Sequence, residues 1–183
     1  MYDYLIIHGS YGSPFENWFP WLFNKLEQEG KKVLAPQFPT ISQNYDNWNS
    51  VMQTYDKYID NNTSIIAHSL GPAFIIDYLY EHKKSVKNLF LVAPFYGLIN
   101  IADFDFVNKT FFVLSDLTKA NEYFHSAWCI FSDNDPYVPI SLSKNFSGAL
   151  NATELIITGG GHLNSSAGYT TFKELWDVIK KNE

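Results

Sequence analysis

Residues 63–73 constrain the fold of this chain more than any other stretch. The first part, residues 64–67, is a short apolar run with β-branched residues, too short for a helix and typical of a strand buried on both faces. After Pro72, which the first turn of a helix tolerates, a largely apolar run predicts a helix that packs on a sheet. A buried strand, a sharp turn and a helix therefore follow one another directly.

Ser69 lies in that turn, and small residues flank it in the pattern Ala-x-Ser-x-Gly at residues 67–71. The pattern fits a nucleophile elbow, where a serine in a strained conformation leaves no room for bulky neighbours, with alanine in place of the usual first glycine. The alternative is an ordinary strand-to-helix turn with an N-capping serine. The strand before the turn and the helix after it favour the elbow, and with it Ser69 as a nucleophile.

Other segments predict an alternation of strands and helices along the whole chain. The expected strands are 5–7, 33–35, 88–93, 128–132 and 155–158, and the expected helices are 17–29, 48–59 and 169–181. Short apolar strands separated by helices favour a mostly parallel sheet covered on both faces. No repeat or linker divides the chain, so we expect residues 1–183 to form a single domain, a three-layer α/β/α sandwich with right-handed crossovers.

The segment 95–126 is the least regular part of the chain and is rich in phenylalanine and tyrosine. We expect it to hold a helix and to form a small aromatic cap, and we call it the cap segment. With 46% hydrophobic and 17% aromatic residues, the chain has more aromatic surface than a core requires. Most phenylalanines of the cap segment are expected in the core, and a few beside a cleft would suffice to line an apolar pocket.

Charge and cysteine content exclude several classes of function. The net charge of −6 argues against a broad electrostatic grip on nucleic acid, and all 13 basic residues are lysine. Without arginine, no bidentate guanidinium clamp for phosphate or carboxylate can form. Cys129 is the only cysteine, so neither an intrachain disulfide nor a thiolate metal cluster is expected. A start without a basic leader and the lack of a long apolar run predict a cytoplasmic protein without membrane association.

A serine nucleophile needs a base within hydrogen-bond reach and a third group that orients the base. The later part of the chain offers both, because polar residues follow two expected strands, at 132–139 and at 159–164. The carboxyl ends of parallel strands lie at one edge of a sheet, so Ser69, Asp135 and His162 can meet there. Their order along the chain, Ser, Asp, His, is the order that α/β-hydrolases use.

These motifs carry a resemblance to a known family. The matching pieces are residues 8–10 (HGS), 17–22 (NWFPWL), 68–71 (HSLG), 133–136 (DNDP) with 138–139 (VP), and 161–162 (GH). Over nearly its whole length the chain resembles the small retinoblastoma-binding-protein-9-like (YdeN-like) serine hydrolases of the α/β-hydrolase superfamily. The resemblance implies a compact sheet with the strand order 2-1-3-4-5-6. It also implies that Ser69 is the nucleophile, Asp135 the acid and His162 the base.

Some nearby residues compete for these roles. Asp133 is the alternative acid, but the Asp-x-x-Val-Pro spacing favours Asp135 and leaves Asp133 as a turn residue. His68 cannot be the base, because adjacent residues of an extended strand point to opposite faces; we expect a buried histidine that supports the elbow. By the same resemblance, His8 shapes its loop. The triple glycine before His162 could be a phosphate nest, although a flexible approach to the histidine is simpler.

An acyl-transfer intermediate needs two preorganised N–H donors for its oxyanion. The backbone N–H of Leu70, directly after the nucleophile, is the first candidate. The loop after the first strand should provide the second, and we expect the N–H of Ser10, with Tyr11 as the alternative. The substrate pocket is expected to involve Tyr11, Trp18, Phe95 and Tyr96.

The sequence thus predicts a serine hydrolase that cleaves a small, apolar carboxylic ester, or a related acyl substrate such as an amide, through an acyl-enzyme on Ser69. No metal or cofactor is expected, because the chain lacks a Walker A motif, a GxGxxG fingerprint and a His/Cys cluster. The expected partner is a small-molecule acyl substrate, neither nucleic acid nor membrane, and no protein partner is identified. The alternatives are a protein-interaction module on an idle hydrolase scaffold and a flavodoxin-like ligand-binding domain. The Leu-x-Cys-x-Glu docking signature for a pocket protein is absent.

Overall fold

The computed structural model describes residues 1–183 and contains one six-stranded sheet, in which all paired strands are parallel. The strands are β1 (Tyr4–Ile7), β2 (Val33–Leu34), β3 (Ser64–His68), β4 (Val86–Val92), β5 (Phe124–Ser132) and β6 (Thr153–Ile157). Their order across the sheet is β2-β1-β3-β4-β5-β6, which confirms the predicted α/β fold and strand order.

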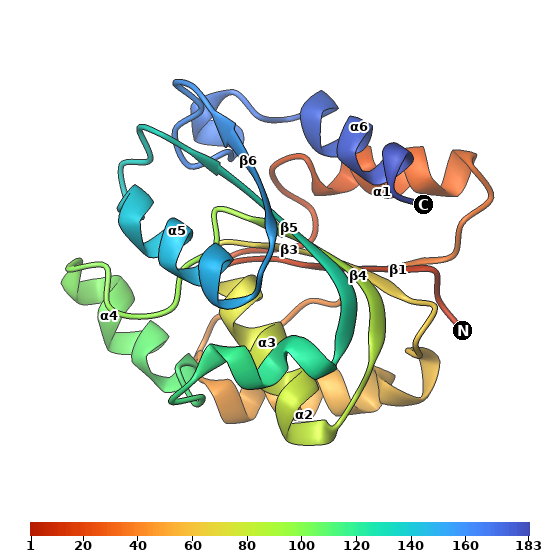
Figure 1. Ribbon diagram of the computed structural model, residues 1–183, viewed down its shortest axis with the longest axis horizontal. Coiled ribbons are helices and arrows are strands. Elements are labelled where there is room, and N and C mark those ends of the chain that lie inside the picture. Colours follow the sequence, from red (N-terminus) through yellow and green to blue (C-terminus); the bar gives the residue numbers. More distant parts are fainter.

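Helices cover both faces of the sheet (Figure 1). The α-helices are α1 (Phe19–Gln28), α2 (Tyr45–Tyr55), α3 (Leu70–His82), α4 (Ala102–Asn108), α5 (Ile140–Ala149) and α6 (Lys173–Lys181). Short 3₁₀ helices are η1 (Asp56–Tyr58), η2 (Lys109–Phe111), η3 (Leu117–Glu122) and η4 (Ser165–Ala167). None of the helices combines the length and the apolar composition that a bilayer span requires.

The alternation of side chains along the strands explains why each face of the sheet has a core of its own. In β1, Tyr4 and Ile6 pack into the cluster that includes buried residues of α1 and α6. Leu5 and Ile7 point the other way, into the larger cluster with α2, α3 and α5. All four residues are buried, so the strand reads as a continuous apolar run rather than an alternating one.

Three helices differ from the sequence-based expectation. Helix α2 begins at Tyr45, because the Asn44 side chain caps it by accepting a hydrogen bond from the Asn47 N–H at 2.9 Å. Helix α6 begins only at Lys173 and has no side-chain cap; the short helix η4 precedes it, capped by Asn164, whose side chain accepts a hydrogen bond from the Ala167 N–H at 3.1 Å. Helix α5 was not expected from the sequence at all.

The cap segment contains α4, η2 and η3 and is tied to α3 by one buried carboxylate. Asp77 accepts hydrogen bonds from the Tyr96 hydroxyl at 2.8 Å and from the N–H groups of Val113 and Leu114 at 3.1 and 3.2 Å. Burial is the main cause that raises the pKa of Asp77, to about 7. Because its hydroxyl is hydrogen-bonded to Asp77, Tyr96 helps to hold the cap segment and does not line the cavity at Ser69. The prediction that Tyr96 is a pocket residue was therefore wrong.

Candidate active site

Ser69 forms a sharp turn between β3, which ends at His68, and α3, which begins at Leu70. Its backbone dihedral angles are φ 60° and ψ −110°, a region that costs a non-glycine residue about 1–3 kcal/mol. The Ser69 N–H donates to the carbonyl of Val92 at 2.9 Å, which ties the turn to the end of β4. The serine is therefore held in a strained conformation with its side chain at the edge of the sheet.

Two glycines make room for this turn. A Cβ atom on Gly71 would lie 2.9 Å from the His8 carbonyl oxygen, so only a glycine lets α3 start against the end of β1. A Cβ atom on Gly9 would lie 2.7 Å from the Ser69 Cβ atom and 3.2 Å from its Oγ atom. The sequence motif pointed to the first glycine, whereas the steric role of Gly9 became visible only in the structure.

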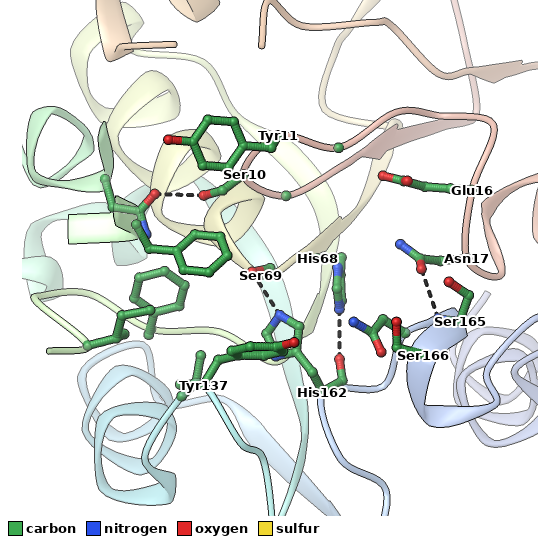
Figure 2. A pocket seen from close by; sticks show the side chains of 18 residues that line it. Ser10, Tyr11, Glu16, Asn17, His68, Ser69, Tyr137, His162, Ser165 and Ser166 are labelled. Atoms are coloured by element: carbon green, nitrogen blue, oxygen red, sulfur yellow. Dashed lines mark hydrogen bonds between the residues drawn. The ribbon is translucent and has the colours of Figure 1, made fainter. Parts of the chain in front are cut away.

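The structure brings together the three side chains that the sequence proposed as nucleophile, base and acid. The Ser69 hydroxyl lies 3.0 Å from His162 Nε2 (Figure 2), and His162 Nδ1 lies 2.7 Å from Asp135 Oδ2. The side chains of His162 and Asp135 are only 9% and 4% exposed, which shields this contact from bulk water. Each residue follows a different strand, β3, β5 or β6, at the same edge of the sheet.

Backbone donors hold the Asp135 carboxylate. Its Oδ1 atom accepts hydrogen bonds from the N–H groups of Tyr137 and Val138 at 2.8 and 3.0 Å, which leaves Oδ2 for His162. Asp133 instead accepts a hydrogen bond from the Gly159 N–H at 2.8 Å, so it joins two loops rather than forming a simple turn.

The triple glycine before His162 is not an anion nest, because all three N–H groups are occupied. Gly159 donates to Asp133, Gly160 to the Ser132 hydroxyl at 2.9 Å, and Gly161 to Asn134 Oδ1 at 2.8 Å. The acceptors are consecutive residues at the end of β5 and in the loop after it. The loop that carries His162 is thus fixed by the loop that carries Asp135.

His68 supports the loop of His162 rather than the elbow itself. Its Nε2–H donates to the His162 carbonyl at 2.9 Å (Figure 2). Burial lowers the pKa of His68 to about 3, so the ring stays neutral at physiological pH. His8 shapes its own loop, as expected: Nδ1–H donates to the Gly9 carbonyl at 2.8 Å, and Nε2 accepts from the Phe38 N–H at 3.0 Å. Burial lowers the pKa of His8 as well.

Free backbone donors lie where an oxyanion hole was expected. Leu70 is the first residue of α3, so its N–H has no partner within the helix. The Ser10 N–H donates to no group of the protein. The Tyr11 N–H, the alternative donor, is spent on Gln43 Oε1 at 2.8 Å. The hydrogen bonds therefore favour Ser10 over Tyr11 as the second donor.

A cavity of about 240 Å³ opens at Ser69 and His162. Aromatic rings border one part of it, in contacts that run from Tyr11 to Phe104, from Phe104 to Tyr137 and from Tyr137 to His162 at centroid distances of 5.9, 6.0 and 5.1 Å. On the other side of Ser69 and His162 the cavity has a polar wall, formed by Glu16, Asn17, Ser165 and Ser166 (Figure 2). No lysine lines the cavity.

Of the four expected pocket residues, the structure places two at the cavity. Tyr11 and Phe95 line it, but Trp18 and Tyr96 do not. Trp18 is fully buried, and its Nε1–H donates to the Leu163 carbonyl at 2.9 Å. It therefore holds the residue that follows His162 and does not face the cavity. Its assignment to the pocket was therefore wrong.

Several lining residues were missed from the sequence. They are Glu16, Asn17, Ile99, Phe104, Asn108, Tyr137, Val138, Asn164, Ser165 and Ser166. The residues of the polar wall lie in a loop and in the short helix η4, which show no periodicity, and only Asn17 fell within a motif that carried the family resemblance. No group of three or more His, Cys, Asp or Glu side chains is arranged to hold a metal ion.

The strand order, the strained serine turn and the loops at the carboxyl edge define an α/β-hydrolase. Residues 4–181 match the serine hydrolase family model, so the chain belongs to that family. It is 28% identical to the YdeN hydrolase of Bacillus subtilis (strain 168) over 182 residues, covering 95% of this chain and 92% of YdeN. The crystal structure of the ydeN gene product from B. subtilis superposes with a TM-score of 0.91 at 26% identity, covering 100% and 98% of the two chains. The YdeN-like resemblance is thus confirmed.

More distant structures share the fold. A carboxylesterase of the thaumarchaeon Nitrososphaera gargenis has a TM-score of 0.76 at 11% identity, covering 98% of this chain and 89% of its own. Est1E from Butyrivibrio proteoclasticus has a TM-score of 0.74 at 16% identity, covering 98% of this chain and 87% of its own. At these identities the likeness concerns the architecture alone.

Proposed function

We propose that this hydrolase cleaves small, neutral carboxylic esters through an acyl-enzyme on Ser69. The observation that carries the proposal is the chain of contacts from Ser69 Oγ to His162 Nε2 at 3.0 Å and from His162 Nδ1 to Asp135 Oδ2 at 2.7 Å. Such an arrangement lets a histidine take the serine proton as the serine attacks. Asp135, with its other oxygen held by backbone donors, keeps the proton of the neutral ring on Nδ1.

The reaction proceeds in two steps with the same residues. His162 takes the proton of Ser69 as Oγ bonds to the ester carbonyl carbon, and then gives this proton to the departing alkoxide, which leaves as an alcohol. Water next attacks the acyl-enzyme while His162 takes its proton, and the acid is released as Ser69 regains a proton. The N–H groups of Leu70 and Ser10 stabilise the oxyanion in both steps, and the loss of one such donor typically costs about 2.7–4 kcal/mol.

The cavity supports a small, neutral substrate. Its volume of about 240 Å³ lies below the range of about 300–1,000 Å³ that is usual for drug-sized ligands. The aromatic contacts from Tyr11 to Tyr137 suit an apolar acyl group. Without arginine in the chain or lysine in the lining, no cation can neutralise an anionic group of the substrate. The match of residues 4–181 to the serine hydrolase family supports hydrolysis as the reaction class.

Labelling with a fluorophosphonate probe tests the proposal, with intact-mass detection. The wild type should gain one adduct, Ser69→Ala none, and His162→Ala should react far more slowly. Hydrolysis of a short-chain ester then compares Asp135→Asn, expected to lose about three to four orders of magnitude in kcat, with its matched control Asp133→Asn, expected within a few-fold of the wild type. A folded wild type without labelling, or labelling that persists in Ser69→Ala, would refute the mechanism.

A further inference from the structure

Asn108, the last residue of α4, connects the cap segment to the oxyanion loop (residues 9–12). It is only 1% exposed and lines the cavity at Ser69. Its Oδ1 atom accepts a hydrogen bond from the Ser10 hydroxyl at 2.6 Å, a contact between residues 98 positions apart. The dashed line at Ser10 in Figure 2 marks this bond.

The rest of the oxyanion loop is fixed by other partners. Tyr11 donates its N–H to Gln43 Oε1 at 2.8 Å, Gln37 Nε2 donates to the Gly12 carbonyl at 3.1 Å, and the Gly12 N–H donates to the Gly9 carbonyl at 3.2 Å. Ser10 differs from its neighbours, because its N–H is free and its only hydrogen bond to the protein is the one from its hydroxyl to Asn108. Asn108 is therefore the only group that holds Ser10 by a hydrogen bond.

The acceptor is itself held in place. The Tyr11 hydroxyl donates to the Asp103 carbonyl in α4 at 3.3 Å, and the Tyr45 N–H donates to Thr110 Oγ1 at 3.2 Å, just after α4. The N–H groups of Val113 and Leu114 end on the Asp77 carboxylate. The cap segment is anchored on both sides of Asn108. The amide oxygen of Asn108 is therefore held in position to accept the hydrogen bond from the Ser10 hydroxyl.

We propose that Asn108 is a positioning residue that aims the Ser10 N–H at the oxyanion. The proposal rests on the function proposed above, since the oxyanion forms only if Ser69 attacks an acyl group. Because the oxyanion exists only in the transition state and the intermediate, the contribution of Asn108 falls on kcat rather than on KM. An uncharged acceptor suits this place, because a carboxylate beside the hole would repel the developing negative charge.

A direct role of Asn108 is the competing explanation. Its Nδ2 atom has no partner in the protein, so it could donate to the substrate itself. The two roles differ in how Asn108 and Ser10 depend on each other. If Asn108 acts through Ser10, removal of the Ser10 hydroxyl removes its effect, whereas a direct contact with substrate remains.

A double-mutant cycle separates the roles, with kcat and KM measured for the wild type, Asn108→Ala, Ser10→Ala and the double variant on one short-chain ester. Ser10→Ala keeps the N–H and loses only the hydroxyl. We expect each single variant to lose about 10- to 100-fold in kcat with KM within about twofold, since a misplacement of about 1 Å costs up to about 100-fold. The double variant should be no slower than the slower single variant. Losses that multiply in the double variant would overturn the proposal.

The matched control is Asn121→Ala, which removes an amide whose Nδ2 donates to the Ala149 carbonyl at 3.1 Å, outside the cavity. It should keep the wild-type kcat, and urea denaturation should show that Asn108→Ala is still folded. A trifluoromethyl ketone, which forms an oxyanion on Ser69, should inhibit Asn108→Ala more weakly by the same factor as the loss in kcat/KM.

The outcomes separate this proposal from the proposed function. Wild-type kcat in Asn108→Ala, together with fluorophosphonate labelling of Ser69, would refute the positioning role alone. Unchanged ketone inhibition despite a lower kcat would also refute it. Failure of the wild type to label at Ser69 would instead refute the hydrolase mechanism, and the positioning role with it.

Discussion

The close approach of Gly9 to the serine gives a sharp prediction for Gly9→Ala. The new Cβ atom would lie 2.7 Å from the Ser69 Cβ atom and 3.3 Å from the His68 carbonyl oxygen. Carbon atoms normally come no closer than about 3.5 Å, so the two residues must separate by about 0.8 Å. Ser69 is bound to Val92 in a strained turn, and the oxyanion loop is held by its own hydrogen bonds, so neither can yield without loss.

The separation acts on the chemistry more than on the fold. Whether Ser69 or the oxyanion loop moves, the distance between the proposed nucleophile and the proposed oxyanion donor changes by nearly 1 Å, which costs up to about 100-fold in rate. The overpacking itself destabilises a protein by about 1–3 kcal/mol. We therefore expect kcat/KM of Gly9→Ala to fall by about 100-fold and its free energy of unfolding by about 1–3 kcal/mol.

The assay combines ester hydrolysis with urea denaturation, and fluorophosphonate titration corrects kcat for the reactive fraction of each variant. Gly148→Ala is the matched control, because a Cβ atom there meets nothing within 4 Å and the residue lies in α5. It should keep full activity and gain about 0.5–1 kcal/mol of stability. Wild-type kcat/KM in Gly9→Ala, or equal losses in both variants, would refute the argument that close packing against Ser69 governs the rate.

Three further predictions concern residues around the cavity. His68 stays neutral in the folded protein because burial lowers its pKa to about 3, whereas the unfolded chain binds a proton below about pH 6.5. The stability due to His68 is thus present above pH 6.5 and is lost toward pH 3 by about 1.4 kcal/mol per pH unit. Urea denaturation at pH 7, 6 and 5 should therefore show that the wild type loses stability faster than His68→Gln. Parallel losses in the two proteins would contradict this. Glu16→Gln removes an exposed negative charge from the polar wall of the cavity. It should raise kcat/KM about 2- to 5-fold for an ester with a carboxylate on its leaving group and leave kcat/KM for a matched neutral ester unchanged. Equal changes for both esters would argue against a charge effect. Trp18→Phe leaves the Leu163 carbonyl unpaired and should lower the free energy of unfolding by about 1–3 kcal/mol in urea denaturation, whereas an unchanged midpoint would show that the bond contributes nothing.

The central strands β1 and β3 were predictable from sequence because each is a short, largely apolar run that is buried along its whole length. The start of β5 at Phe124 was missed, because its first residues are half-buried or polar. Helix α5 was not predictable, because its residues, ISLSKNFSGA, include several poor helix formers and no clear periodicity. The helix exists because Phe146 is buried in the core, a tertiary contact that no local pattern encodes.

The proposed reactive residues were predictable for a different reason. Ser69, Asp135 and His162 each follow a strand, and their order and spacing restrict the choice. Trp18 and Tyr96 were misplaced, because an aromatic residue with a polar atom goes where that atom finds a partner. The partner of Trp18 lies 145 residues away in sequence, and the partner of Tyr96 is a carboxylate inside α3. Local sequence contains neither fact.

The run Ser132, Asp133, Asn134 reads as a turn in sequence, yet its side chains bind the N–H groups of all three glycines before His162. None of these bonds involves Asp135, so the position of the histidine loop is set independently of the proposed acid. The 2.7 Å contact between Asp135 and His162 instead acts on the ring, because it sets both the tautomer and the orientation of the imidazole. Consecutive residues thus have different roles: residues 132–134 fix the loop that carries His162, and Asp135 orients its ring.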